Sequence, residues 1–308
     1  MVQAWTGLGS AYLVPDRVEV LRRKMKSVVY RLVGAGTGGS DVIVKSCLRD
    51  TAIVERDIYA NVLPQILSEP VGYYGFADDG GGEFCWLFLA DLRGDEFEAG
   101  NLEHREVATR WLARLHTRSA NLAAAAELPD RGPGYYREHL QAARLTIRRN
   151  YGNPALSPGD REVLDRVLAQ FDFVESRWEG IEDACRKMPR SLVHGDFAER
   201  NLRIRRGDAG LELVAFDWEV AGWGLPPVDL ADADLRLYAS AARDLWSSMD
   251  FETMLQMVSV CKLLRGGLAA SNWTVPSLAT EWVEKPILNL SIYQMRIREN
   301  LQALGWLR

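Results

Sequence analysis

The sequence predicts an α+β protein, with an antiparallel sheet near the N-terminus and mostly helices after it. Two observations support this class. Short runs of β-branched and aromatic residues alternate with glycine-rich turns between residues 28 and 89. From residue 106 onwards, apolar residues recur at the spacing of helices. A third observation, a strand, loop and hairpin at 191–213, interrupts the helices and carries closely spaced polar residues.

Two N-terminal strands are predicted at 28–33 and 41–44, joined by a turn at 35–40. This turn overlaps the letters G-A-G-T-G-G at 34–39, which match G-x-G-x-x-G. A dinucleotide-binding loop would lead directly into a helix, with an acidic residue about 20 positions later. A β-branched strand follows here instead. We therefore interpret the glycines as the turn of a β-hairpin.

The other elements follow from periodicity and composition. A helix is predicted at 52–66, and a buried strand, F-C-W-L-F-L, at 84–89. Helical spacing predicts the later helices 106–119, 135–151 and 162–188, with more inside 251–308.

Composition bounds the classes of protein that the chain can belong to. Its 308 residues suffice for a sizeable core, and the formal net charge of −5 argues against nucleic acid as a partner. We see neither a membrane span nor a signal peptide. The cysteines lack metal-ligand spacing, which favours a reduced, cytoplasmic compartment. They are Cys47, Cys85, Cys185 and Cys261.

The central motif is H-G-D-F-A-E-R-N at 194–201, followed by F-D-W-E at 216–219. An apolar strand at 191–193 precedes it. Alternating strands at 202–204 and 211–213, with a turn at 206–210, lie between its two parts.

The polar residues of this motif suit phosphoryl transfer. That chemistry needs a carboxylate near the attacking hydroxyl, and an amide oxygen and a second carboxylate to hold magnesium against nucleotide phosphates. Asp196, Asn201 and Asp217 supply these groups in that order.

The motif resembles the catalytic loop of kinases, H-x-D-x-x-x-x-N followed by a metal-binding aspartate. It differs from protein kinases in two places: Gly195 stands where they usually carry arginine, and D-W-E stands where they carry D-F-G. In both places the sequence resembles the aminoglycoside phosphotransferase and choline kinase family. The resemblance covers about Arg22 to Tyr238. It implies a bilobal protein-kinase-like fold, with a nucleotide-binding lobe at 1–92 that ends in a hinge and a catalytic, acceptor-binding lobe at 93–308.

The resemblance also implies roles for individual residues. Asp196 would accept or orient the proton of the acceptor hydroxyl, and Asn201 and Asp217 would hold Mg²⁺. Lys45, which ends V-I-V-K, would bind the phosphates of ATP or GTP, and Glu55 would hold Lys45 in an ion pair. A strand lysine that simply faces solvent is the structural alternative for Lys45.

Supporting roles are implied for other positions. His194 would fix the loop geometry, and Asp229, in G-L-P-P-V-D-L-A, would brace the loop through backbone hydrogen bonds. The hinge that receives the nucleotide base would consist of Leu89, Ala90 and Asp91.

Two assignments stay open between chemistry and solvation. The basic segment 22–27, with Ser27, is either the loop over the phosphates or a solvated turn. The acids of 219–234 either favour a cationic acceptor or stabilise helix N-termini, and we prefer the second interpretation. These acids are Glu219, Asp229, Asp232 and Asp234. We interpret His116 as structural, because no second metal ligand is suitably spaced.

The predicted function is ATP- and magnesium-dependent O-phosphotransfer to a hydroxylated small molecule. The acceptor would be an antibiotic such as an aminoglycoside, a sugar or an amino alcohol, and antibiotic resistance is one possible role. The alternatives are a kinase fold that modifies proteins or transfers a nucleotidyl group, and a nucleotide-binding pseudokinase. The pseudokinase is disfavoured because all four residues of the expected site are present.

Overall fold

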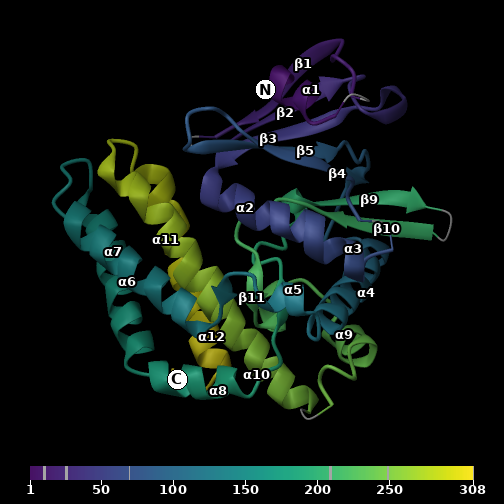
Figure 1. Cartoon of the computed structure of the whole chain (residues 1–308). Helices are drawn as coiled ribbons and strands as arrows, with labels where there is room; N and C mark the ends of the chain where they lie inside the picture. Colours follow the sequence, from purple (N-terminus) through teal and green to yellow (C-terminus); the bar gives the residue numbers. More distant parts are fainter. Residues whose placement is uncertain (10–11, 25–26, 69, 208–209, 248–249, 308) are drawn as a thin grey trace. The chain divides into compact units, whose positions relative to one another are not determined.

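The computed structural model describes residues 1–9, 12–24, 27–68, 70–207, 210–247 and 250–307. The chain forms two compact units (Figure 1). The first consists of 1–129 and 196–222, and the second of 130–195 and 223–308. The predicted lobe boundary at residue 92 stays a prediction, since these units are divided differently.

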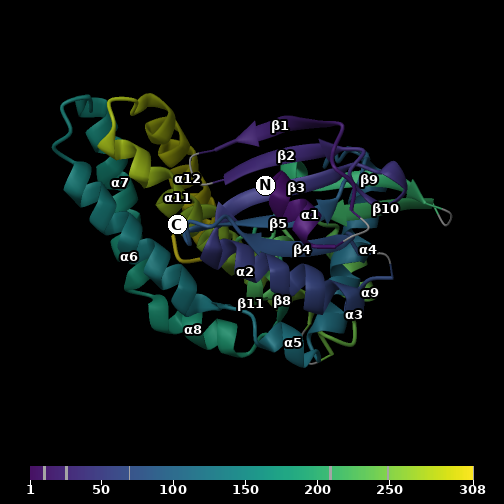
Figure 2. The same cartoon turned by 45° about the horizontal axis from the view of Figure 1, so that its top comes forward.

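The first unit contains a five-stranded antiparallel sheet in the order β1-β2-β3-β5-β4 (Figure 2). Its strands are β1 (Arg17–Arg23), β2 (Ser27–Val33), β3 (Val42–Leu48), β4 (Tyr73–Asp78) and β5 (Phe84–Ala90). This sheet and the helices that surround it confirm the predicted α+β class.

The predicted hairpin is confirmed, because β2 and β3 pair antiparallel across the glycine-rich segment. A short 3₁₀ turn, η1 (Thr37–Gly39), lies between them, and Gly34 and Gly38 have φ values of 71° and 67°. Glycine adopts this region without the steric cost of a Cβ. β3 runs four residues beyond the predicted end at 44, because its pairing with β5 extends to Leu48. Lys45 therefore lies inside the strand.

The strands β1 and β4 were not predicted. Both are edge strands, and the residues of β1 are nearly all exposed. An edge strand needs no apolar alternation, so its sequence carries little signal.

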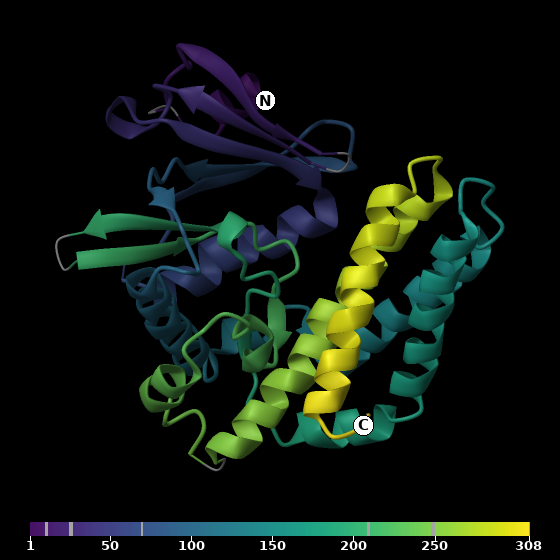
Figure 3. The same cartoon turned by 180° about the vertical axis from the view of Figure 1, so that it is seen from behind.

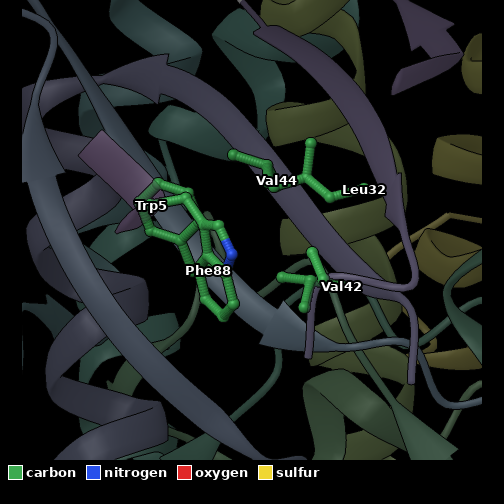
Figure 4. Close-up of a cluster of buried hydrophobic side chains, with 6 residues drawn as sticks. Trp5, Leu32, Val42, Val44 and Phe88 are labelled. Atoms are coloured by element: carbon green, nitrogen blue, oxygen red, sulfur yellow. The ribbon is translucent and has the colours of Figure 1, made fainter. Parts of the chain in front are cut away.

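One face of the sheet buries an apolar cluster against α1 (Val2–Gly7) (Figure 4). Trp5 lies 5.5 Å from Phe88 between ring centroids, and Val42 and Val44 belong to the same cluster. Side chains alternate along a strand, so Lys45 lies on the opposite face from these valines.

Helical segments cover that opposite face of the sheet. The prediction at 52–66 is confirmed as a continuous run of α2 (Arg49–Asp57), the π-helical η2 (Ile58–Val62) and α3 (Leu63–Ile66). α2 packs against β3 and β5.

The remainder of the first unit includes helices and a small sheet. The helix α4 (Leu102–Ser119) begins earlier than predicted because the Asn101 side chain caps it, accepting from two backbone N–H groups. It packs against β10 of the sheet β10-β9-β6. The other bounds are α5 (Ala123–Ala126), β6 (Asp95–Glu96), β9 (Leu202–Gly207) and β10 (Gly210–Ala215). Residues 208 and 209 of the predicted turn lie outside the described residues.

The second unit is mostly helical, and Figure 3 shows it from behind with α12 in yellow. α12 packs against α7 and η5, and α6 also packs against η5. The helices are α6 (Pro133–Asn150), α7 (Pro158–Glu175), α8 (Trp178–Arg186), α9 (Leu235–Ala241), α10 (Phe251–Cys261), α11 (Ala270–Thr274) and α12 (Glu284–Ala303). The shorter elements are β7 (Asp130–Arg131), β8 (Ser191–Val193), β11 (Gly222–Gly224), η4 (Pro226–Asp229), the π-helical η5 (Lys262–Ala269) and η6 (Val275–Ala279).

The prediction of one helix at 162–188 is wrong. The structure has α7 and α8, separated at Arg177, whose φ and ψ of −110° and 12° are not helical. α7 packs against α6 and α12, whereas α8 packs against α6 and α10. An apolar periodicity that continues through the break hides it from the sequence. Among the described helices, none has the length and apolar character needed to cross a membrane.

Candidate active site

The backbone before Asp196 is held by Asp229. The Asp229 carboxylate accepts hydrogen bonds from the backbone N–H groups of His194 (2.7 Å) and Gly195 (2.9 Å). Both His194 and Asp229 are buried, so two backbone donors receive their acceptors away from water. The φ of Gly195 is 74°, in the left-handed region that favours glycine. Arg265 Nε also donates to the Gly195 carbonyl, at 2.9 Å.

Asn201 forms hydrogen bonds with two other parts of the motif, Asp196 and Phe216. Its Nδ2 donates to the backbone carbonyl and to the carboxylate Oδ2 of Asp196, both at 2.9 Å. Its backbone carbonyl accepts from the N–H of Phe216 at 3.1 Å, next to Asp217. The hairpin of β9 and β10 separates these residues in sequence, and its antiparallel pairing brings its two ends together.

The donor set fits a hard divalent cation. Asn201 is buried, and its Oδ1 has no hydrogen-bond partner among the described residues. An amide oxygen beside carboxylates is a typical magnesium ligand set. Asp217 is the one described non-glycine residue with positive φ, 68°. Aspartate tolerates this conformation better than most residues, and such outliers concentrate at functional sites.

Lys45 lies within a cluster of carboxylates. Its Nζ forms ion pairs with Glu55 and Asp217 and lies 3.6 Å from Glu219. The three acids could also share a metal ion, since one ligand oxygen from each lies within 4.8 Å of the others. Burial disfavours the charge on Lys45, but the carboxylates of Glu55 and Asp217 raise its pKa well above the ordinary value.

Burial and the charge of Lys45 shift the pKa of the Glu55 carboxyl in opposite directions. Burial raises the pKa of Glu55 to about 7, and the nearby charge of Lys45 only partly counters this. Glu55 is fully buried in α2, which packs against β3 and β5.

These groups open onto a cavity of about 440 Å³ within the first unit. The predicted residues that line it are Ser27, Lys45, Glu55, Leu89, Ala90, Asp91 and Asp217. Its apolar lining includes Val29, Ile43, Val71, Val214 and Phe216. Basic side chains line it as well, namely Arg22, Lys24, Arg31, Arg93, Arg200 and Arg203. A cavity with apolar walls and many cations suits a flat base attached to phosphates.

The segment 22–27 forms the end of the β1–β2 hairpin. The Lys24 N–H donates to the Ser27 carbonyl at 2.8 Å and closes the turn. Met25 and Lys26 lie outside the described residues. Arg22, Lys24 and Ser27 line the cavity, and the choice between phosphate loop and solvated turn stays a prediction.

The three hinge candidates lie at and just after the end of β5. The N–H of Ala90 donates to Gly72 O at 2.7 Å, and that of Asp91 to Asp41 O at 3.2 Å. The Asp91 carboxylate accepts from Arg31 Nε at 2.7 Å. Their role in binding a nucleotide base stays a prediction.

The acids of 219–234 divide between the two interpretations. Asp234 caps α9 by accepting from two backbone N–H groups, as the helix interpretation predicts. Glu219 lies instead beside Lys45. His116 is fully buried in α4, within the first unit.

Sequence reasoning missed Arg200, Tyr59 and Phe216 as cavity residues. Arg200 stands immediately before the proposed magnesium ligand Asn201, and this position was the available signal. Tyr59 and Phe216 lie in a helix and after a strand, where aromatic residues are ordinary core.

Comparisons with known proteins agree with this geometry. Residues 25–251 match the family model described as the phosphotransferase enzyme family. No curated protein sequence matches the chain.

Solved structures share the fold at low sequence identity. A microcompartment-associated aminopropanol kinase is 14% identical with a TM-score of 0.66, covering 99% of this chain and 98% of its own. Choline kinase from Cryptosporidium parvum Iowa II is 15% identical with a TM-score of 0.63, covering 97% and 92%. A spectinomycin phosphotransferase in complex with ADP and spectinomycin is 10% identical with a TM-score of 0.62, covering 100% and 99%. The kinase-like fold that the motif implied is thereby confirmed.

Proposed function

The chain belongs to the phosphotransferase enzyme family, and on this premise we propose that it transfers the γ-phosphoryl group of ATP or GTP to a hydroxyl of a small molecule. The observation that carries the proposal is the cavity that Lys45, Glu55 and Asp217 line together with apolar and basic side chains. Asp196 and Asn201 flank Arg200, which lines the cavity, and they are hydrogen-bonded to each other.

The proposed roles follow from this geometry. Lys45, held by Glu55 and Asp217, binds the nucleotide phosphates. Asn201 and Asp217 hold Mg²⁺, which supplies positive charge against the β- and γ-phosphates when bound. Asp196 accepts the proton of the acceptor hydroxyl. The acceptor oxygen forms a bond to the γ-phosphorus while the bond to the β–γ bridging oxygen breaks, and the nucleoside diphosphate leaves with that electron pair.

The remaining site residues support this arrangement. We propose that Ser27 contacts the phosphates and that Leu89, Ala90 and Asp91 receive the base. His194 and Asp229 hold the catalytic loop, through the hydrogen bonds that end on the Asp229 carboxylate. Positioning of this kind dominates phosphoryl transfer, because little covalent chemistry falls to the protein.

The acceptor class is proposed from the proteins of similar fold. The names of three of them identify aminopropanol, choline and spectinomycin as related to their activity. We propose a hydroxylated metabolite or antibiotic of comparable size, without nucleic acid or membrane as a partner. The four cysteines are free and buried, which supports a cytoplasmic location.

The test is a screen for ADP release from MgATP and MgGTP. The acceptors are amino alcohols, sugars, spectinomycin and aminoglycosides, and Asp196→Asn is the blank. We expect one acceptor class to raise ADP release and to gain about 80 Da, the mass of a phosphoryl group. A gain of about 329 Da would indicate nucleotidyl transfer instead. Failure of the protein to bind any nucleotide would contradict the proposal.

A further inference from the structure

The short 3₁₀ helix η3 (Glu199–Asn201) folds the catalytic loop back on itself. Arg200, four residues after Asp196, thereby donates through one terminal guanidinium nitrogen to the Asp196 Oδ2. Asn201 Nδ2 donates to the same oxygen at 2.9 Å. Two donors on one oxygen restrict the rotation of a carboxylate, so Arg200 helps to determine how Asp196 is oriented.

Arg200 also lines the cavity that contains Lys45 and Asp217. Its side chain is 57% exposed, whereas that of Asp196 is 16% exposed. An ion pair with one exposed partner is weak, so the guanidinium can exchange partners at small cost. Arg200 is therefore a cation at the phosphate cavity that is bound loosely to the proposed base.

Three other cations of the cavity already have partners, whereas Arg22 and Lys24, from the β1–β2 hairpin, line it as well. Arg31 is paired with Asp91 and Glu19, and Arg93 with Asp41. Arg203 lies over the Phe216 ring, 5.3 Å from its centroid.

Lys45 has three carboxylates around it, so its cluster as a whole is negative. A γ-phosphate placed beside the cluster would be stabilised by further positive charge in addition to that of bound Mg²⁺. Arg200 is well placed to supply it, because it comes from the catalytic loop itself.

We propose that Arg200 is a catalytic residue that binds the oxygens of the γ-phosphate while it keeps Asp196 aimed at the acceptor hydroxyl. This inference rests on the proposed function. A guanidinium suits both tasks, since its planar fork carries five donors and can contact two anions at once. Arg200 stays protonated throughout. The acceptor proton passes to Asp196, and the charge that accumulates on the γ-phosphoryl oxygens is stabilised by Arg200.

The first test compares a nucleoside diphosphate with a triphosphate analogue that also carries the terminal phosphate. Calorimetry measures the Kd of MgADP and of the magnesium complex of a non-hydrolysable ATP analogue. For Arg200→Ala, we expect the Kd of the triphosphate analogue to rise about ten-fold or more and that of MgADP to stay unchanged. Arg200→Lys keeps the charge without the fork and should give an intermediate Kd.

The matched control is Arg110→Ala. Arg110 is 55% exposed and pairs with Glu106, four residues before it, so the exposure of the arginine and the spacing of the pair resemble those of Arg200 and Asp196. It lies in α4 and does not line the cavity. The control should bind both nucleotides as the wild-type protein does.

The second test is chemical rescue. ADP release from MgATP, with water as acceptor, should fall about 10²-fold to 10³-fold in Arg200→Ala. Added guanidinium chloride at millimolar concentration should restore part of it, and sodium chloride at equal ionic strength should not. A merely structural role would lower Tm and give no rescue.

The outcomes separate this inference from the proposed function. If the wild-type protein binds neither nucleotide, the proposed function fails. If it binds both, and Arg200→Ala weakens them equally or not at all, the role of Arg200 is overturned while the proposed function stands. Circular dichroism establishes that each variant is folded, and Arg200→Lys keeps the test decisive if the alanine variant is not.

Discussion

The two parts of the candidate site within the first unit are built in opposite ways. In the Lys45 cluster, the lysine and Glu55 side chains are 9% and 1% exposed. On the catalytic loop, Arg200 is 57% exposed beside Asp196. Charges in a buried cluster interact strongly and depend on every partner, whereas an exposed pair contributes little to stability. Folding therefore fixes the proposed phosphate-binding part, whereas the exposed ion pair of the loop can change partners at small cost.

The largest effect is expected at Asp217, which belongs to the buried part. Asp217→Ala removes a proposed magnesium ligand and a partner of Lys45, so turnover should fall by about 10⁴-fold or more. Steady-state ADP release measures this loss. Lys45 keeps Glu55 as a partner, so the circular dichroism spectrum should resemble that of the wild-type protein. Glu179→Ala, at an exposed acid in α8, is the control, and near-normal turnover in folded Asp217→Ala would refute the assignment.

Asp196→Asn tests the loop in the same assay. Loss of a positioned base costs about 10² to 10⁴ in rate, so the effect should be somewhat smaller than at Asp217. The Kd of MgADP should stay at its wild-type value, because the change lies beside the acceptor rather than the diphosphate. If Asp196→Asn also weakened the binding of MgADP, Asp196 would not act on the acceptor alone.

The burial of Glu55 should make the free energy of unfolding depend on pH. Its pKa is raised from 4.5 to about 7, so the folded state holds this proton more tightly than the unfolded state. The free energy of unfolding of the wild-type protein should therefore fall as pH rises through this window. Between pH 5 and pH 8 this contribution is on the order of 1 to 3 kcal/mol.

Glu55→Gln lacks this titration, so urea denaturation at pH 5 and pH 8 should give a smaller loss of stability than in the wild-type protein. Glu179→Gln, at an exposed position in α8, controls for removal of a carboxylate. Equal pH dependence in Glu55→Gln and the wild-type protein would mean that the buried cluster does not hold this proton.

The smallest effect is expected at Glu199, an exposed residue of the loop. Glu199 accepts a hydrogen bond from the N–H of Ala99 at 2.6 Å, and the contact is exposed. Glu199→Ala should lower the free energy of unfolding by about 0.5–1.5 kcal/mol. Thermal unfolding measures this change. A loss as large as that expected for a buried group would show that the loop is more rigid than its exposure implies.

The prediction of the fold succeeded where burial leaves a periodic pattern. β3 and β5 are buried and carry β-branched or aromatic residues, and both were predicted from the sequence. β1 was missed because an exposed edge strand leaves no such pattern. The break at Arg177 was missed because α7 and α8 are both amphipathic, and only their different packing partners separate them.

The site residues predicted from the sequence belong to a compact motif. Asp196 and Asn201 stand five positions apart, and the hairpin after them leads to Asp217. Arg200 was missed because an arginine in a polar loop is usually solvated. The walls of the cavity, such as Val29 and Val214, were missed because core packing and cavity lining select the same apolar residue types.

By itself, the sequence determined the chemical groups available for phosphoryl transfer and their order along the chain. Local patterns encode these features, since strand alternation and turn residues act over a few positions. Tertiary structure alone decided that Lys45 contacts Asp217, 172 positions away, and that Glu55 is buried, which raises the pKa of its carboxyl. Such contacts depend on which elements pack together, and the charge state of a buried group depends on everything that excludes water from it.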